Sequence, residues 1–360
     1  MSEFNRYSRQ LLVSQVGEHG QRQIAKATVL IIGAGGLGCQ VAAQLAGAGV
    51  GDIRIVDHDV VNLSNLHRQM LFREADLGHS KARVAAREMR AINSQIKVSA
   101  IETRIALDNV KELINLVDLV IDAADNFATS YLLSDTCLEQ GTPMLSASVN
   151  RTFGYLGVFC GSEKRTAPSM RAVFPKLPIS QQSCDTVGVT GPSVGIIASL
   201  QAQEALKVLL DDEQQLLGKL LYCDLWNYQQ HIIDFSGATE PETSRIKLIN
   251  AAQILQSDTV IDVRSADEIN RSPQTFQVNQ HIPLANLVNH INALPNGPRI
   301  VLACQTGQRA LMGAQQLLNQ GHQNIAVVLP EGSSSAEGSS SAEGSSSAEG
   351  SSSTKGSSGS

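Results

Sequence analysis

The sequence predicts an α/β fold with two domains, a Rossmann-like, mostly parallel sheet and then a smaller α/β domain. The first observation is length, since about 330 of the 360 residues precede a Ser/Gly-rich repeat, and that length is typical of two domains. The second is the order of elements, because apolar runs alternate with amphipathic stretches as in parallel sheets covered by helices. The repeat, residues 332–360, lacks apolar periodicity and is expected to be a flexible, disordered tail of the kind used as an expression linker.

Residues 29–59 contain a complete strand, glycine turn, helix and second strand. The apolar run 29–32 predicts a buried strand, and the glycines after it allow a tight turn close to a phosphate. These glycines are Gly33, Gly35, Gly36 and Gly38. Gly38 is expected to open the helix, whose first N–H groups favour an anion.

Asp57 lies 21 positions after Gly36, at the end of the second strand. At about this distance a carboxylate accepts both ribose hydroxyls of a bound nucleotide. A tight structural turn is the alternative, but the strand, the helix and the acid together favour a nucleotide site.

Cations and amides are concentrated in residues 62–69 and at Lys81, where a helix over residues 80–92 is expected. Asn65, Arg68 and Lys81 beside a phosphate loop suit the charge of a triphosphate. The rival class, an NAD-dependent dehydrogenase, needs its additional chemistry near a nicotinamide ring instead.

An apolar run over residues 119–122 leads into Asp125. Because ligands of open α/β sheets collect at the carboxyl ends of strands, Asp125 is a candidate site residue. The alternative is that Asp125 caps the next helix, residues 127–140. The first domain is completed by expected strands at 144–148, 154–161, 220–224 and 231–235 and by a helix at 195–210.

Two further parts of the first domain each leave two interpretations open. Arg6 and Arg9 precede an amphipathic stretch that ends at Ile24, and they are either solvated surface or a phosphate contact across a dimer interface. Cys184 lies in a polar, irregular segment, residues 162–189, and such segments are usually either functional or mobile.

In the second part of the chain, Cys304 directly follows an expected strand over residues 299–303. A thiol at a strand end, surrounded by loop N–H groups and facing a helix N-terminus, has its pKa lowered and its anion stabilised. A buried, inert cysteine is the alternative, but nearby Arg309 favours the reactive one. Another buried strand is expected at 260–264, and the polar residues 236–244 form the expected linker.

Composition excludes several classes of protein. The net charge is −6 and the pI about 5.8, with Lys and Arg scattered along the chain, so nucleic acid is not an expected partner. No export signal and no apolar run of membrane-spanning length is present, so we expect a cytoplasmic protein without a membrane partner. The six cysteines form no CxxC pair and are expected to be reduced thiols.

Ordered motifs give the chain a family resemblance. They are RYSRQ at 6–10, GAGGLG at 33–38, Asp57 and Asp59, SNLHRQ at 64–69, Lys81, Asp122 with Asp125 and Asn126, and GP at 191–192 before QAQEALK at 201–207. Through them residues 4–235 resemble the MoeB/ThiF group, relatives of the ubiquitin-activating enzymes. The later part resembles a rhodanese through DVR at 262–264, Glu268, HIPL at 281–284 and the Cys304 loop. The implied division is an adenylation domain (1–235), a linker (236–244), a shortened rhodanese-like domain (245–331) and the tail (332–360).

The resemblance implies a site for ATP and Mg²⁺, with the magnesium near Asp125. The implied ATP-binding residues are Arg9, Gly33, Gly35, Gly36, Gly38, Asp57, Asp59, Ser64, Asn65, Leu66, His67, Arg68, Gln69, Lys81, Asp125 and Asn126. Arg9 would reach the site of the other subunit of a homodimer. The implied catalytic residues are Arg68, Lys81, Asp125, Cys184 and Cys304. Cys184 occupies the position of a loop cysteine that joins covalent sulfur or acyl transfer in some members, and its role here stays open.

The sequence departs from the family pattern in two places. The structural zinc of the family is bound by two CxxC pairs, but Ser169 and Ala172 stand at the first pair and the second pair is missing. We therefore expect no zinc and a loop held by packing alone. The rhodanese-like part also ends early, after Glu331, which puts the stability of that domain in doubt.

The function implied by the resemblance is adenylation of the C-terminal glycine of a small ubiquitin-like sulfur-carrier protein. A persulfide on Cys304, loaded from thiosulfate or a persulfide donor, would then supply sulfur for a thiocarboxylate in molybdopterin, thiamine or tRNA thiolation. The alternatives are adenylation alone with the rhodanese-like half as a docking module, a scaffold without chemistry, and an NAD-dependent oxidoreductase.

Overall fold

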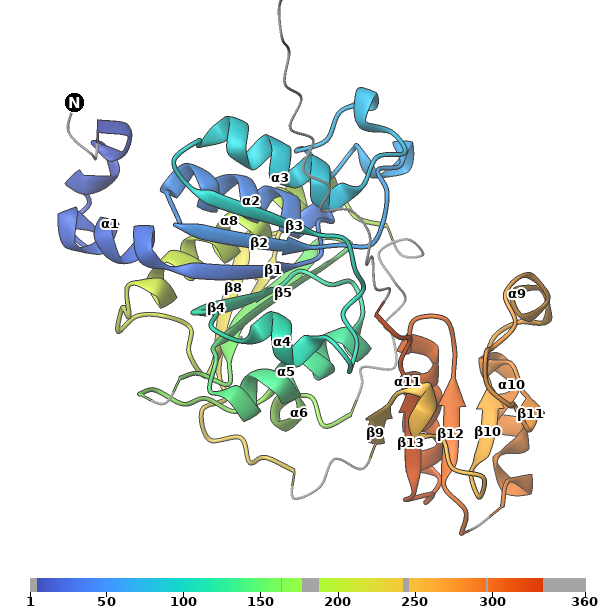
Figure 1. Cartoon of the computed structure of the whole chain (residues 1–360). Helices are drawn as coiled ribbons and strands as arrows, with labels where there is room; N and C mark the ends of the chain where they lie inside the picture. Colours follow the sequence, from blue (N-terminus) through green and yellow to red (C-terminus); the bar gives the residue numbers. More distant parts are fainter. Residues whose placement is uncertain (1–4, 163, 177–187, 242–245, 296, 333–360) are drawn as a thin grey trace, which may run out of the picture.

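The computed structural model describes residues 5–162, 164–176, 188–241, 246–295 and 297–332, so Cys184 and the repeat from residue 333 lie outside the described residues. Two sheets organise the described chain, and each is covered by helices (Figure 1). None of the described helices is both long enough and apolar enough to cross a membrane.

The larger sheet has eight strands in the order β3-β2-β1-β4-β5-β6-β7-β8. Neighbours from β3 to β5 are parallel, whereas β5 to β8 pair antiparallel. The strands are β1 (Thr28–Ile32), β2 (Asp52–Val56), β3 (Lys97–Ile101), β4 (Leu119–Asp122), β5 (Met144–Asn150), β6 (Phe153–Phe159), β7 (Lys219–Asp224) and β8 (Gln229–Asp234). The predicted Rossmann-like, mostly parallel sheet is confirmed.

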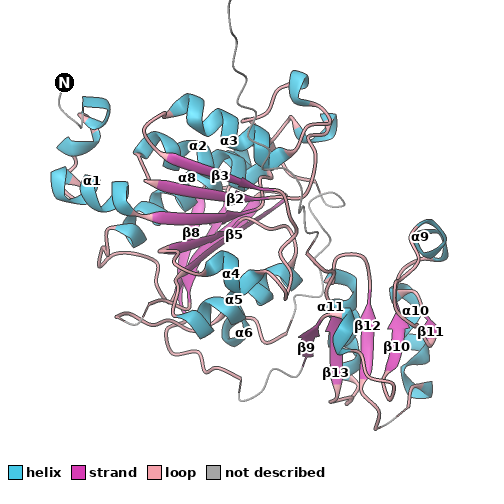
Figure 2. Cartoon of the chain, in the orientation of Figure 1, coloured by secondary structure: helices cyan, strands magenta, loops and turns pink. Residues whose placement is uncertain are grey.

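Helices cover both faces of this sheet (Figure 2). One face carries α2 (Gly36–Ala48), α3 (Lys81–Ile92) and α8 (Gly191–Leu209), and the other carries α4 (Val110–Ile114), α5 (Phe127–Gln140) and α6 (Met170–Val173). The remaining helical segments of this domain are η1 (Asn5–Tyr7), η2 (Gln10–Leu12), α1 (Gly17–Lys26), η3 (Leu63–Asn65) and η4 (Glu74–Asp76). Successive side chains of β1 point to opposite layers, with Val29 and Ile31 in one and Leu30 and Ile32 in the other, so all four residues after Thr28 are apolar.

The start of α2 corrects one expectation, because the helix begins at Gly36 and not at Gly38. Gly35 is the extended N-cap, so the turn is complete two residues earlier than predicted. Gly38 is needed for packing instead, since a Cβ there would lie 1.8 Å from the Gly33 carbonyl oxygen. The helix can therefore approach the phosphate loop closely only with glycine at this position.

The smaller sheet has five strands, all parallel, in the order β11-β10-β12-β13-β9. The strands are β9 (Ile246–Ile249), β10 (Thr259–Asp262), β11 (Gln280–His281), β12 (Ile300–Ala303) and β13 (Ile325–Val328). The helices are η5 (Ala251–Gln253), α9 (Ala266–Arg271), α10 (Leu284–His290), η6 (Ile291–Ala293) and α11 (Gln308–Asn319). The expected smaller α/β domain is confirmed.

The two domains pack against each other through α5 and the loops after β12 and β13. Ala128 of α5 and Leu329 after β13 belong to one apolar cluster. A Cβ added at Gly307, just before α11, would lie 3.1 Å from the Ala128 Cβ. Part of the apolar surface of the smaller domain is thus covered by the larger one.

Candidate functional site

A cavity of about 1480 Å³ lies at the carboxyl edge of the larger sheet. Most of the residues predicted to bind a nucleotide line it: Gly33, Gly35, Gly36, Asp57, Asp59, Ser64, Asn65, Arg68, Gln69, Lys81, Asp125 and Asn126. Four predicted residues do not: Gly38 packs beneath the turn, Leu66 and His67 lie outside the lining, and Arg9 is exposed elsewhere on the same chain. The size and the lining suit a nucleoside triphosphate.

The glycine turn leaves room for a phosphate. Gly33 has a φ of +94°, and a Cβ at this position would lie 2.8 Å from the Ala123 carbonyl oxygen. A Cβ at Gly36 would lie 2.9 Å from Val194. Larger residues at these positions would therefore displace the backbone or the wall of the cavity, so the turn fits the close approach that a phosphate requires.

Asp57 connects the end of β2 to the glycine turn. Its two carboxylate oxygens accept hydrogen bonds from the N–H groups of Ala34 and Asp59, each at 2.7 Å. Burial raises the pKa of Asp57, while these N–H donors and Lys81 act in the opposite direction. Each oxygen keeps a further lone pair, so the same carboxylate can shape the turn and accept ribose hydroxyls.

The cations predicted to meet a triphosphate are held at the wall of this cavity. Lys81 is buried, with its side chain 8% exposed, and its ammonium lies 3.1 Å from the Asp59 carboxylate. Arg68 donates to the Ser64 carbonyl at 3.2 Å, and one of its guanidinium nitrogens lies 2.8 Å from the His67 ring. His67 therefore supports Arg68 from outside the lining.

Asp125 is not the N-cap of α5, so that alternative is wrong. The cap is Asn126, whose side chain accepts the Thr129 N–H at 2.9 Å. Asp125 is exposed at the cavity, and among the described residues its carboxylate makes no hydrogen bond or ion pair. Asp122 below it is buried and accepts from the Ser146 hydroxyl at 2.8 Å. Burial raises the pKa of Asp122, which leaves Asp125 as the carboxylate suited to a divalent cation.

A second group of potential metal ligands lies at the same edge. The ligand atoms of Asp57, His58 and Asp59 lie within 4.8 Å of one another, and among the described residues this is the one such cluster. Asp57 is bonded to two backbone N–H groups and Asp59 to Lys81, so these carboxylates are already engaged.

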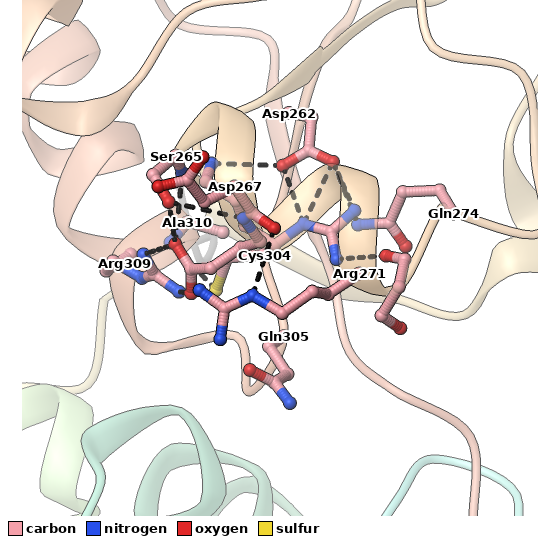
Figure 3. A network of polar contacts seen from close by, with 12 residues as sticks. Asp262, Ser265, Asp267, Arg271, Gln274, Cys304, Gln305, Arg309 and Ala310 are labelled. Carbon is pink, nitrogen blue, oxygen red and sulfur yellow. Dashed lines mark hydrogen bonds and ion pairs between the residues drawn. The ribbon is translucent and has the colours of Figure 1, made fainter.

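Cys304 follows β12 in the smaller domain, surrounded by charged side chains (Figure 3). The thiol is buried, and its sulfur accepts the N–H of Ala310, in the first turn of α11, at 3.4 Å. Arg309 pairs with Glu268 at 2.5 Å, and this guanidinium holds the pKa of Glu268 well below its usual range. A buried pair, Asp262 with Arg264, supports the base of the same loop at 2.7 Å.

The order and spacing of these residues are those of a known family. Residues 7–244 match the model described as the ThiF family, and residues 246–337 match the model described as a rhodanese-like domain. The chain belongs to the ThiF family. The ThiF-family domain provides most of the cavity lining, and the rhodanese-like domain holds Cys304.

The names of the relatives include adenylyltransferase, and some of them also include sulfurtransferase. It is 41% identical over 225 residues to "Adenylyltransferase and sulfurtransferase MOCS3" of Culex quinquefasciatus, covering 62% of this chain and 51% of that protein. It is 40% identical over 226 residues to "Sulfur carrier protein adenylyltransferase" of Thermus thermophilus, covering 62% of this chain and 83% of that protein. The chain spans about half the length of the MOCS3 relatives.

Among solved structures, the chain is similar to Escherichia coli MccB. The complex of MccB with AMPCPP and MccA gives a TM-score of 0.57 at 25% identity, covering 66% of this chain and 72% of that one. The complex of MccB with MccA-N7isoASN gives 0.58 at 25% identity, covering 66% and 73%. Both matches agree with the fold of the ThiF-family domain.

The segment around Ser169 in the ThiF-family domain is held by polar contacts, so the expectation of packing alone is wrong. The Ser169 N–H and hydroxyl donate to the two carboxylate oxygens of Glu240, at 2.5 and 2.6 Å. Arg171 pairs with Asp135 at 2.7 Å. The sequence pattern pointed only to the missing cysteine ligands of a zinc ion. It gave no sign that Glu240, in the expected linker, would bind Ser169.

Several cavity residues of the ThiF-family domain were missed. They include Arg104 after β3, and Ser148, Asn150, Arg151 and Tyr155 from β5 and β6. A strand over residues 97–101 would have placed Arg104 at the ligand edge, but β3 is partly exposed and short. The five described cysteines, Cys39, Cys137, Cys160, Cys223 and Cys304, are free thiols as expected.

Proposed function

We propose that the ThiF-family domain transfers AMP from ATP to the C-terminal glycine carboxylate of a small ubiquitin-like sulfur carrier. The observation that carries this proposal is the convergence, at one sheet edge, of a glycine turn, Arg68, buried Lys81 and Asp125, a carboxylate without a partner in the described part of the chain. The relatives named adenylyltransferases and the similarity to MccB with AMPCPP support it.

In this reaction a carboxylate oxygen attacks the α-phosphorus, and pyrophosphate leaves with the electron pair of the broken P–O bond. Arg68 and Lys81 bind the phosphate oxygens and stabilise the charge of the leaving pyrophosphate. The glycine turn holds the phosphates in line, and Asp57 orients the ribose. Because the attacking group is already a carboxylate, no general base is needed and positioning supplies most of the acceleration.

Asp125 fits a magnesium ion, because it is an exposed carboxylate without another partner among the described residues, on the wall that faces the glycine turn. Magnesium, when bound, neutralises phosphate charge. Asn126 beside it offers little to the metal, since its side-chain oxygen caps α5.

The rhodanese-like domain supplies the sulfur. The Cys304 thiolate attacks the outer sulfur of thiosulfate or a persulfide, and sulfite or a thiolate leaves. The terminal sulfur of the new persulfide then attacks the acyl-adenylate carbonyl, AMP leaves, and a second thiol reduces the acyl disulfide to release the thiocarboxylate. Ala310 is placed to stabilise sulfur anion by its N–H group.

The carrier needs a surface next to the cavity, and the antiparallel part of the larger sheet offers one. Every residue of β8 is exposed, including Ile232 at 63% and Ile233 at 53%, and β8 is the edge strand. Tyr222 of β7 lines the cavity and is 36% exposed, so this apolar surface reaches the nucleotide site. Exposed apolar side chains beside a cavity are typical of a protein-binding site.

A homodimer is part of the proposal. Arg9 is exposed and lies outside the cavity of its own chain, next to the exposed Leu12 and Val13. If Arg9 contacts phosphate, it does so in the cavity of a second copy.

Carrier-dependent exchange of labelled pyrophosphate into ATP tests the adenylation. We expect exchange with a diglycine-ending carrier and none with the same carrier lacking its last glycine. No exchange with any copurified carrier would favour a scaffold, and reduction of NAD would favour an oxidoreductase. Mass spectrometry of small proteins pulled down with the chain identifies the carrier, and so the choice among molybdopterin, thiamine and tRNA thiolation.

A further inference from the structure

One wall of the nucleotide cavity belongs to the rhodanese-like domain. Gln305 and Thr306, which follow β12, and Leu329 and Pro330, which follow β13, line the cavity together with the ThiF-family residues. In both sheets the loops that line the cavity follow the carboxyl ends of parallel strands. Loops at the carboxyl ends of both sheets therefore border one cavity, and the smaller domain lies beside the carboxyl ends of the larger sheet (Figure 1).

Two polar contacts join the Cys304 loop to this cavity. Arg104 donates to the Gln305 carbonyl at 3.3 Å, and its other terminal nitrogen lies 2.8 Å from the ring of His58, next to Asp57. The Gln308 side-chain oxygen accepts the Phe127 N–H at 2.8 Å. Both ThiF-family groups lie at ends of strands or helices that bound the nucleotide site.

Gln308 accepts a hydrogen bond from a backbone N–H at the start of α5 for which the described part of the ThiF-family domain provides no acceptor. The first N–H groups of a helix have no acceptor within the helix. Asn126 accepts the N–H of Thr129, and the N–H of Phe127 is left to the glutamine of the other domain. Asp125 and Asn126 thus lie directly before the residue that Gln308 holds.

Gln308 also belongs to the turn that binds the sulfur. It is the first residue of α11, and two residues later the Ala310 N–H donates to Cys304 Sγ. Gly307, directly before Gln308, packs against Ala128. The same short turn therefore contacts the Cys304 sulfur and the N-terminus of α5.

We propose that Gln308 is a positioning residue, which docks the Cys304 loop on the nucleotide cavity so that sulfur passes to an acyl-adenylate made by the same chain. This rests on the proposed function. Cys304 does not itself line the cavity, whereas the next residue does. A persulfide places the reacting sulfur about 2 Å beyond Sγ, so the position of the loop decides whether that sulfur reaches the acyl carbonyl. The C–O bond to AMP breaks as the C–S bond forms.

The test compares Gln308→Met, which removes the acceptor at similar volume, with Gln308→Glu, which keeps one. Gln320→Met, an exposed glutamine at the other end of α11, is the control. Three rates are measured in the full chain: carrier-dependent pyrophosphate exchange, sulfur transfer from thiosulfate to cyanide, and formation of carrier thiocarboxylate.

We expect Gln308→Met to slow thiocarboxylate formation by roughly tenfold or more, since small misplacements of reacting groups have effects of that order, with exchange and cyanide transfer unchanged. Gln308→Glu and Gln320→Met should behave as wild type. Unchanged thiocarboxylate formation in Gln308→Met would overturn the proposal, as would an equal loss of cyanide transfer, because Gln308 would then act on the loop itself. Absence of exchange in the wild type would refute the adenylation and not the docking.

A mixture of two inactive variants tests the statement that one chain does both steps. Arg68→Ala chains keep Cys304, and Cys304→Ala chains keep the nucleotide site. We expect no thiocarboxylate from the mixture. Thiocarboxylate formed by the mixture would show transfer between chains and overturn this part of the proposal.

Discussion

The nucleotide cavity and the Cys304 loop lie at the same kind of place, the carboxyl edge of a parallel sheet, yet they are assembled differently. The cavity collects groups from the ends of β1, β2 and β4 and from the loop at residues 62–69, so it depends on the whole domain. The thiol is held within one short turn, with Glu268 and Arg309 beside it. Removing one side chain from the cavity should therefore slow its reaction without abolishing it. Removing the Cys304 thiol should abolish the chemistry of the second site.

The largest expected effect is that of Cys304→Ala. Thiocarboxylate should disappear from the mass spectrum of the carrier when thiosulfate is the donor, because no other described thiol lies at the carboxyl edge of the smaller sheet. Pyrophosphate exchange should persist. Loss of both activities would show that the two sites are not separable, and product at the normal rate would assign the sulfur to an external donor acting through Cys184.

Asp125→Ala and Arg68→Ala should each slow pyrophosphate exchange by roughly two to three powers of ten, or about 3 to 4 kcal/mol. The fold should stay intact, because Asn126 caps α5 and neither side chain is part of the core. Glu112→Ala, an exposed carboxylate on α4, is the matched control. An exchange rate within twofold of wild type would remove the substituted residue from the site.

Glu268→Gln should reduce sulfur transfer to cyanide severalfold and lower the stability of the rhodanese-like domain by about 1 kcal/mol, a modest value because the pair is partly exposed. The pKa of Glu268 is depressed in the folded state. Its contribution is therefore fully present above its unfolded pKa, about 4.3, and is lost progressively as the pH falls from there through the lower pKa of the folded state. Thermal unfolding of wild type and variant should show a smaller difference at pH 3 than at pH 7.

The smallest expected effect on activity concerns Ser169 and Glu240. The purified protein should contain no stoichiometric zinc, since serine and alanine occupy the first pair of ligand positions. Glu240→Ala should cost about 1 to 2 kcal/mol of stability through the lost hydrogen bonds to Ser169, without an effect on exchange. One zinc per chain by elemental analysis would contradict the prediction.

The same comparison explains how much the sequence could predict. The strand, glycine turn and helix at residues 28–48 are local, and periodicity gave them correctly except for the helix start at Gly36. The position of Cys304 at the end of β12 was also predicted correctly from the local pattern. Arg104 was not, because β3 is short and half exposed and its pattern resembles a loop.

Local sequence patterns did not predict which side chains contact each other in the folded structure. Asn126 and not Asp125 caps α5. Both residue types are favoured as N-caps, so the sequence alone does not show at which of the two neighbouring residues the helix begins. The pairing of Ser169 with Glu240 joins residues 71 positions apart. The contact between Gln308 and Phe127 joins two domains across 181 positions, and no periodicity encodes it.

Loops at the carboxyl ends of both sheets border one cavity, and this arrangement has a kinetic consequence. An acyl-adenylate is a reactive mixed anhydride, and water competes with sulfur for it throughout its lifetime. A tethered nucleophile is present at an effective concentration on the order of millimolar, whatever the concentration of the protein. If the ThiF-family domain makes an acyl-adenylate as proposed, the covalent link between the domains sets the partition between thiocarboxylate and wasted ATP, and dilution of the protein leaves that partition unchanged.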